Sequence, residues 1–149
     1  MKSMKMTLLA ATFALATLPA LLAGQSTDQA AVRQAALNYV TAVYEGKTDL
    51  IHQSVAPDLV KFGYMRQQDG SYRTGQMSFE QLLEVAKTWN ANGQRDTSVK
   101  AVEVYDVLDQ TASAKVTASW GSDYLLLAKL DGTWKIRQII WQTPPPAGR

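Results

Sequence analysis

The pattern of hydrophobic and polar positions divides the chain into an early helical part and a late part made of strands. Between Ser26 and Gly46, apolar residues recur every three or four positions, which places them on one face of a helix. Ser26 and Gln29 have the spacing of a capping box, and Gly46 is a typical residue for a helix end. The pattern therefore predicts a long first helix over residues 26–46.

Two further helices are predicted before residue 94. A short one opens at Thr48 or Asp49 and closes before Pro57, because a residue that precedes proline disfavours the helical conformation. A longer one opens with a second capping-box pattern at Ser78, and Gly93 has the position of its C-terminal cap. Its apolar positions have helical spacing and are expected to face the core.

Strands account for the rest of the pattern. Residues 59–76 read as a hairpin around Asp69-Gly70, and only strands are predicted after Val99. Residues 111–120 alternate strictly between small apolar and polar side chains, as in a half-buried strand. A turn at Asp109-Gln110 would place Glu103 on the same face as the apolar residues of 111–120. A shift of one residue in the strand pairing would instead turn Glu103 to solvent, and a solvated Glu103 is the favoured interpretation. The last hairpin turns at Asp131-Gly132.

Counting outward from that last turn assigns the side chains of the final hairpin to two faces. One face takes Asp123, Leu125, Leu127, Trp134, Ile136, Gln138 and Ile140, and the other takes Tyr124, Leu126, Ala128, Lys135, Arg137, Ile139 and Trp141. Both faces carry apolar bulk, so one is expected to cover the helices and the other to meet a second subunit. The predicted homodimer patch consists of Val102, Val104, Leu126, Ile139 and Trp141.

The N-terminus changes the picture of where the protein acts. Residues 1–23 combine a basic start with a short uncharged apolar run and small residues near Ala23 and Gly24, the pattern of a cleavable signal peptide. A periplasmic or secreted protein is expected, with one domain over residues 26–143 and a proline-rich tail over 144–149. No stable membrane span is expected after cleavage.

Charge and composition narrow the function classes. Removal of Lys2 and Lys5 reduces the basic residues from fifteen to thirteen, against thirteen acidic ones, so the mature chain is formally neutral. A neutral chain without a basic cluster lacks the electrostatic footprint of nucleic-acid binding. The absence of cysteine excludes disulfides and thiolate metal sites, and the single histidine has too few partners for a metal site, so neither a metal nor a cofactor is expected.

The order of elements and several segments resemble a known superfamily. The chain is similar to the nuclear-transport-factor-2-like (SnoaL-like) proteins, and within them to the lumazine-binding branch, in the segments "AVYEGKTD", "KFGYMRQQDGSY", "MSFEQL", "ASAKVTASWGSDYLLLAKLDGTWKI" and "IIWQ". The resemblance implies an α+β, cystatin-like fold, in which a cone-shaped curved sheet wraps about three helices and its open end holds a small molecule. It implies no single function, because this superfamily contains both enzymes and binding domains.

The ketosteroid isomerase-like members of the superfamily allow a comparison of individual residues. Those enzymes use a tyrosine on the first helix and a protonated aspartate on a late strand to stabilise an enolate oxygen, and a second aspartate moves the proton. By this resemblance, Tyr39 matches the tyrosine and Asp123 the late-strand acid. Gly63 stands where the proton-transferring carboxylate would be, and Glu103 or His52 would have to replace it.

Each candidate also has a structural interpretation. Asp123 could bond backbone at a strand entrance, Tyr39 and Trp89 have the spacing of core residues, and His52 reads as an exposed residue of a short helix. Trp134 is expected in the core, and Trp120 and Trp141 suit a pocket rim or a subunit contact. The predicted ligand-binding set is Tyr39, Tyr64, Trp89, Tyr105, Trp120 and Asp123.

Two function classes remain after this comparison, with a plainer third. The favoured one is a non-catalytic binding domain for a small organic molecule, which the family label suggests is lumazine-like. The alternative is a small lyase, isomerase or cyclase in which Asp123 and Tyr39 work with Glu103 or His52. In the third, the cone is filled by its own side chains and the domain only assembles.

Overall fold

Three helices and six strands make up the computed structural model, which describes residues 18–98 and 100–146. The helices are α1 (Leu18–Glu45), α2 (Thr48–Ser54) and α3 (Phe79–Thr88); the strands are β1 (Val55–Arg66), β2 (Tyr72–Met77), β3 (Lys100–Val107), β4 (Thr111–Ala118), β5 (Gly121–Leu130) and β6 (Thr133–Gln142). The predicted order of elements and the α+β class are confirmed. No helix in the described part of the chain is long and apolar enough to cross a membrane.

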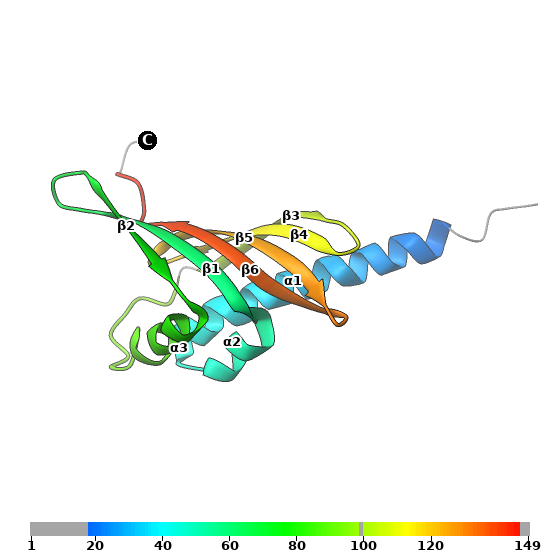
Figure 1. Ribbon diagram of the computed structural model, residues 1–149, viewed down its shortest axis with the longest axis horizontal. Coiled ribbons are helices and arrows are strands. Elements are labelled where there is room, and N and C mark those ends of the chain that lie inside the picture. Colours follow the sequence, from blue (N-terminus) through cyan, green and yellow to red (C-terminus); the bar gives the residue numbers. More distant parts are fainter. Residues whose placement is uncertain (1–17, 99, 147–149) are drawn as a thin grey trace, which may run out of the picture.

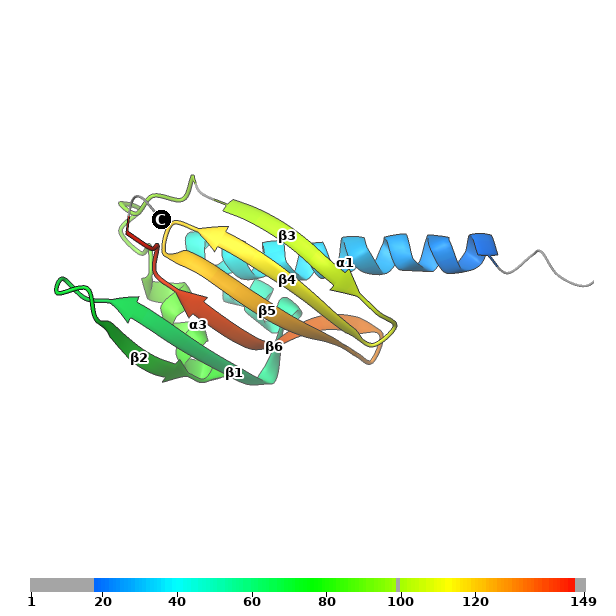
Figure 2. The same cartoon turned by 90° about the horizontal axis from the view of Figure 1, so that it is seen from above.

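The strands form one curved mixed sheet with the order β2-β1-β6-β5-β4-β3 (Figure 1). The β1–β6 pair is parallel, and every other neighbouring pair is antiparallel. All three helices lie on the same side of the sheet, with α1 running beneath its length (Figure 2). The core fills the space between this inner face and the helices, so the opposite, outer face is left without a covering layer.

Helix α1 is longer at its start than the predicted first helix. It begins at Leu18 rather than at Ser26, because Pro19 falls in its first turn, where proline is tolerated, and the single Gly24 does not break it. The Thr27 hydroxyl donates to the Gly24 carbonyl (2.7 Å) inside the helix. Most of the predicted signal peptide, residues 1–23, lies outside the described residues.

The predicted end of α1 is confirmed. Gly46 has a φ of 70°, a left-handed conformation that favours glycine, and the Lys47 N–H donates to the Ala42 carbonyl (3.0 Å). The apolar face predicted for this helix is buried throughout, with Val32, Ala36 and Tyr39 completely inaccessible to solvent.

The predicted start of helix α3 at Ser78 is confirmed, and its predicted end at Gly93 is wrong. Ser78 and Gln81 form the complete capping box, with the Ser78 N–H donating to Gln81 Oε1 (2.8 Å) and the Gln81 N–H to Ser78 Oγ (3.3 Å). The helix stops at Thr88, and a turn of residues 90–93 follows, in which the Gly93 N–H bonds to the Asn90 carbonyl (2.9 Å). Gly93 (φ 66°) therefore ends this turn and not the helix.

The three predicted hairpin turns are present. Asp69-Gly70 connects β1 and β2, Asp109-Gln110 connects β3 and β4, and Asp131-Gly132 connects β5 and β6. Asp131 (φ 48°) and Gly132 (φ 78°) are both left-handed, as a type I′ turn requires.

The faces predicted for β6 are wrong beyond Ile136. Leu127 pairs with Ile136, but Leu126 pairs with Gln138, so β6 contains one extra residue at this point. Such a bulge reverses the alternation for the rest of the strand. Ile139 is consequently buried and Trp141 half-buried on the inner face, whereas Gln138 and Ile140 are exposed on the outer one.

A similar irregularity decides the position of Glu103. Val107 pairs with Ala112 and Val104 with Ala114, so Tyr105 is the extra residue of a bulge in β3. Glu103 pairs with Lys115 on the outer face and makes an ion pair with it (3.4 Å). The favoured prediction of a solvated Glu103 is confirmed.

The outer face carries a different apolar patch from the predicted one. Of the predicted patch, Val102 and Ile139 are buried, Val104 and Trp141 are half-buried, and only Leu126 is exposed. The large apolar side chains that are exposed on this face include those of Val60, Phe62, Tyr64, Tyr124, Leu126 and Ile140.

Candidate ligand-binding site

A pocket of about 430 Å³ lies between the helices and the inner face of the sheet. Its walls come from α1, β1, the end of β2, α3 and the segment that follows it, the turn between β4 and β5, and the end of β6 with the residue that follows it. The lining residues are Tyr39, Val43, Lys61, Met65, Met77, Leu82, Val85, Trp89, Arg95, Trp120, Trp141 and Thr143. Apolar walls with a few convergent polar groups are the usual composition of a small-molecule site.

Three indole rings give the pocket its aromatic character. Trp120 occupies the turn between β4 and β5, and its ring meets the ring of Trp89 edge to face, with centroids 5.3 Å apart. Tyr44 packs against both rings from behind, at 5.3 and 5.4 Å. Arg95 lies over the outer part of Trp89, 4.9 Å from the ring centroid, in a cation–π arrangement.

The third indole, Trp141, is placed by the bulge in β6 and by a glycine on the neighbouring strand. Gly63 pairs with Trp141 in the parallel β1–β6 ladder, and a Cβ atom on Gly63 would overlap the indole ring. Glycine at this position therefore allows the ring to lie directly over the backbone of β1. The position that would hold a catalytic carboxylate in the isomerase-like enzymes is used here to seat an aromatic wall.

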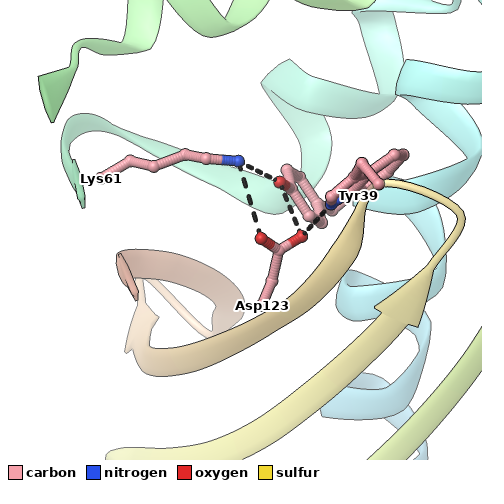
Figure 3. Close-up of polar contacts among 4 residues, drawn as sticks. Tyr39, Lys61 and Asp123 are labelled. Carbon is pink, nitrogen blue, oxygen red and sulfur yellow. Dashed lines mark hydrogen bonds and ion pairs between the residues drawn. The ribbon is translucent and has the colours of Figure 1, made fainter. Parts of the chain in front are cut away.

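A buried polar cluster forms the floor of the pocket (Figure 3). The Tyr39 hydroxyl donates to Asp123 Oδ2 (3.2 Å) and accepts a hydrogen bond from Lys61 Nζ (2.5 Å). The Trp120 indole N–H donates to the same Oδ2 (2.9 Å). Among the described residues, Asp123 Oδ1 has no hydrogen-bond partner, and the Lys61 ammonium lies 3.9 Å from it.

Burial sets the electrostatics of this cluster. The side chain of Asp123 is completely inaccessible and that of Lys61 is only 7% exposed. Burial, the Asp123 charge and the hydrogen bond to Asp123 raise the pKa of Tyr39 well above its ordinary value, so its hydroxyl keeps its proton. Burial lowers the pKa of Lys61, and the Asp123 carboxylate opposes part of that effect. The cluster is therefore an ion pair bridged by a neutral phenol.

The predicted site residues separate into two groups. Tyr39, Trp89 and Trp120 line the pocket, and Asp123 lies beneath them, bonded to both Tyr39 and Trp120. Tyr64 and Tyr105 are exposed, at 43% and 54%, and do not line it.

The two residues proposed as substitute bases lie outside the cluster. Glu103 is on the outer face of the sheet, and His52 lines a second hollow of about 600 Å³ together with Asp28, Gln34 and Lys135. Trp134 is buried as predicted, and its indole N–H donates to Asp28 Oδ1 (3.0 Å) near that second hollow. The described residues contain no group of three or more side chains arranged to hold a metal ion.

Lys61 is the main site residue that the sequence pattern did not reveal. In β1 the inward positions are Leu59, Lys61 and Gly63, and the outward ones are Val60 and Phe62. The usual rule that apolar residues face the core points to the opposite assignment. The available signal was its position: Lys61 lies two residues before Gly63, on the face that was expected to look into the cone.

The fold places the chain among proteins with a curved sheet over helices. Solved structures with this architecture include an NTF-2-like protein of unknown function from Silicibacter pomeroyi DSS-3 (15% identity, 80% of this chain and 98% of that one, TM-score 0.61) and an NTF2-like protein with a cystatin-like fold from Novosphingobium aromaticivorans (11%, 93% and 95%, TM-score 0.61). A domain of unknown function with a cystatin-like fold from Nostoc punctiforme is also similar (12%, 82% and 80%, TM-score 0.54). This is the NTF2-like class of fold.

Within that class, the family is defined by sequence. The model of the family described as "Putative lumazine-binding" matches residues 27–142, and the chain belongs to this family. No curated protein matches the chain. The predicted resemblance to the superfamily and to this branch is confirmed.

Proposed function

We propose that this protein is an exported, non-catalytic domain that binds a flat heteroaromatic molecule between Trp89, Trp120 and Trp141. The observation that carries this proposal is the combination of three indole rings around one pocket with a buried polar cluster at its floor. Stacking on aromatic faces provides affinity for a flat ring, and a few fixed polar groups orient it.

The polar groups define which ligand edges fit. The Lys61 ammonium can donate to a ring carbonyl, and it forms the accessible polar part of the floor. A lumazine, a flat bicyclic ring with two carbonyl oxygens, has such an edge, and the name of the family supports this choice. The ligand's other side would face the apolar side chains of Leu82 and Val85.

The arrangement of the carboxylates supports a binding role over an isomerase-like reaction. Such a reaction needs a carboxylate or imidazole within reach of the substrate proton. Gly63 supplies none, Glu103 faces away on the outer sheet surface, and His52 lines a different hollow. Asp123 is already the acceptor of two hydrogen bonds from the pocket's own residues.

Isothermal titration calorimetry with lumazine tests the binding proposal. Trp89→Leu should weaken binding by about 1–3 kcal/mol, the usual contribution of one aromatic stacking partner to a base-like ring. Tyr105→Ser is the matched control, because Tyr105 is an exposed aromatic residue outside the pocket and its loss should leave affinity unchanged. If neither lumazine nor a related heteroaromatic ring such as flavin or xanthine gives a heat of binding, the proposal is excluded.

The cellular location is part of the same proposal. The basic start and apolar run of residues 1–23 support cleavage near Ala23 or Gly24 and release into the periplasm or medium. Intact mass of the protein recovered from the periplasm measures the new N-terminus. A full-length species retained in the membrane fraction would contradict export.

Pairing of two copies through the outer face of the sheet completes the proposal. Phe62 pairs with Ile140 across β1 and β6, and Tyr124 pairs with Ile140 across β6 and β5. All three side chains are exposed, at 44%, 54% and 53%, and form a continuous apolar row over three neighbouring strands. An uncovered row of this kind is typical of a subunit contact.

A further inference from the structure

Lys61 is an amine in an unusual place. Lysine is almost never fully buried unless it is paired, because removing its charge from water is costly. Here the side chain is only 7% exposed, and Lys61 is one of the residues that line the aromatic pocket. Its Nζ lies 5.1 Å from the centroid of the Tyr39 ring and 5.7 Å from that of Trp141. The amine is therefore held at the end of an apolar chamber that a small molecule can enter.

The residues around Lys61 provide a path for its proton. Lys61 Nζ donates to the Tyr39 hydroxyl (2.5 Å), which donates in turn to Asp123 Oδ2 (3.2 Å). Trp120 also donates to Oδ2, whereas Oδ1 has no hydrogen-bond donor among the described residues and lies 3.9 Å from Lys61 Nζ. The ammonium can pass a proton to the carboxylate through the phenol, which leaves a neutral amine beside a neutral acid.

We propose that Lys61 is a nucleophilic amine that captures small aldehydes or ketones with a flat apolar body as imines. The aromatic walls hold the body of the carbonyl compound, and the Lys61–Tyr39–Asp123 cluster provides the nucleophile and the proton carrier. Desolvation in an apolar pocket is an established way to make a lysine nucleophilic. This activity goes beyond ligand binding and does not depend on the identity of the ring proposed above.

The chemical steps balance without a further reactant. After its extra proton moves to Asp123, the neutral amine attacks the carbonyl carbon; the C–N bond forms and the oxygen takes up a proton. The resulting carbinolamine loses its hydroxyl group with one proton as water, and the C=N bond forms. When the nitrogen takes a proton back, the sum is one ammonium and one carbonyl compound giving one iminium and one water.

The electrostatics of the pocket agree with this geometry. Burial lowers the pKa of Lys61, and each unit of lowering increases the neutral fraction of an amine about tenfold near neutral pH. The titratable groups that meet Lys61 are Tyr39 from α1 and Asp123 from β5, and Arg95 is the other charged residue that lines the pocket. The reactive fraction should consequently be present at a lower pH than for a lysine on the surface.

Reductive trapping tests the proposal on the folded mature protein. Benzaldehyde and sodium cyanoborohydride convert an imine into a stable benzylamine, which adds one benzyl group to the mass. Peptide mapping should find the group on Lys61 about tenfold or more faster than on Lys87, whose ammonium is half exposed and pairs with Glu84. The rate at Lys61 should level off at a lower pH than the rate at Lys87. Equal or slower labelling of Lys61 would overturn the proposal.

Two variants separate reactivity from folding. Lys61→Arg keeps the positive charge but removes the nucleophile, so the rapid phase of labelling should disappear; Lys87→Arg is the matched control and should keep it. If Lys61→Arg does not fold, the site-resolved rates of the wild type still decide the question. Lumazine binding without rapid labelling of Lys61 would reject the nucleophile and leave the binding proposal standing.

Discussion

At the scale of single residues, the site depends on how three polar side chains satisfy one another inside an apolar pocket. Asp123 accepts from Tyr39 and Trp120, and Lys61 is its ion-pair partner within the described part of the chain. A charge that is buried without its partner is strongly destabilising, whereas removing both charges together can be nearly neutral. Loss of one charged residue of the cluster should therefore destabilise the fold more than loss of both.

Substitution of Lys61 should show this dependence directly. Lys61→Met leaves the Asp123 charge uncompensated and should lower the free energy of unfolding by about 3 kcal/mol in urea denaturation at neutral pH. The double variant Lys61→Met/Asp123→Asn removes both charges, keeps an acceptor for Tyr39 and should recover part of that loss. Lys115→Met is the control, because its ion pair with Glu103 lies on the outer face and should contribute less than about 1 kcal/mol. Equal losses of stability in Lys61→Met and Lys115→Met would show that the buried Lys61–Asp123 pair is not coupled more strongly than the exposed pair.

The lowered pKa of Lys61 also predicts a pH dependence. Between that lowered value and the ordinary 10.5, the unfolded chain binds one more proton at this residue than the folded chain does. The free energy of unfolding should therefore rise with pH in this window. Tyr39, whose pKa is raised in the fold, acts in the opposite direction only above its ordinary value of 10.0.

Urea titrations between about pH 7 and pH 10 measure this effect, with Lys61→Met as the reference that lacks the titrating group. The wild type should gain stability relative to the variant as the pH rises. A difference that stays constant, or shrinks, across this range would contradict a lowered pKa.

The residues of this cluster were only partly predictable. Tyr39 and Asp123 were found because a family with known chemistry has residues of the same type at the same positions. Lys61 was not found, because a lysine between Val60 and Phe62 in a strand indicates a solvated position by every pattern rule. Its inward direction follows from tertiary packing, in which β1 presents Val60 and Phe62 to the outer face of the sheet.

At the scale of elements, the bulges in β3 and β6 decide which side chains reach the pocket. The turns and the strands themselves were predictable, since Asp131-Gly132 and the alternation in β4 are local signals. The extra residues at Tyr105 and before Gln138 were not, because both faces of these strands carry apolar side chains and alternation cannot detect a shift of one residue. Because of the bulge in β6, Trp141 lines the pocket and does not lie on the outer face, where the predicted subunit interface placed it.

The parallel pairing of β1 with β6 makes Gly63 a requirement for this wall. Gly63→Ala would place a methyl group in the space of the Trp141 ring, so the ring must move or the strands must separate. We expect a loss of about 1–3 kcal/mol in the free energy of unfolding, together with weaker ligand binding. Gly75→Ala in β2 is the matched control: its Cβ would meet nothing within 4 Å, and the variant should be as stable as the wild type or slightly more so.

The combination Gly63→Ala/Trp141→Leu distinguishes steric overlap from a loss of strand flexibility. A smaller side chain at Trp141 should restore part of the stability that the single Gly63→Ala variant loses. If the double variant is destabilised by the sum of the two single effects, the indole does not lie over Gly63 as described.

At the scale of the whole molecule, the two faces of the sheet differ in what they contact. The inner face covers the helices and borders the pocket, and none of the helices in the described part of the chain lies over the outer face (Figures 1 and 2). Phe62, Tyr124 and Ile140 consequently stay in contact with water in a single copy of the chain. With the proposed signal peptide removed, the chain would be formally neutral, so charge repulsion would do little to keep two such faces apart.

Sizing with light scattering should therefore find dimers at micromolar concentration, and single charges in the apolar row should convert them to monomers. Ile140→Lys lies between Phe62 and Tyr124 in the sheet and should have the largest effect, because a lysine there would be buried without a partner in the interface. The control is Lys87→Glu on α3, which lies on the opposite side of the sheet: it changes the charge without contacting the apolar row, and the variant should remain dimeric. Lys129→Ala is not used as a control, because Lys129 forms an ion pair with Asp28 (2.7 Å). Melting temperatures of both variants verify that the fold is intact. A wild type that is already monomeric, or an Ile140→Lys variant that still dimerises, would show that the outer face is not the contact between copies.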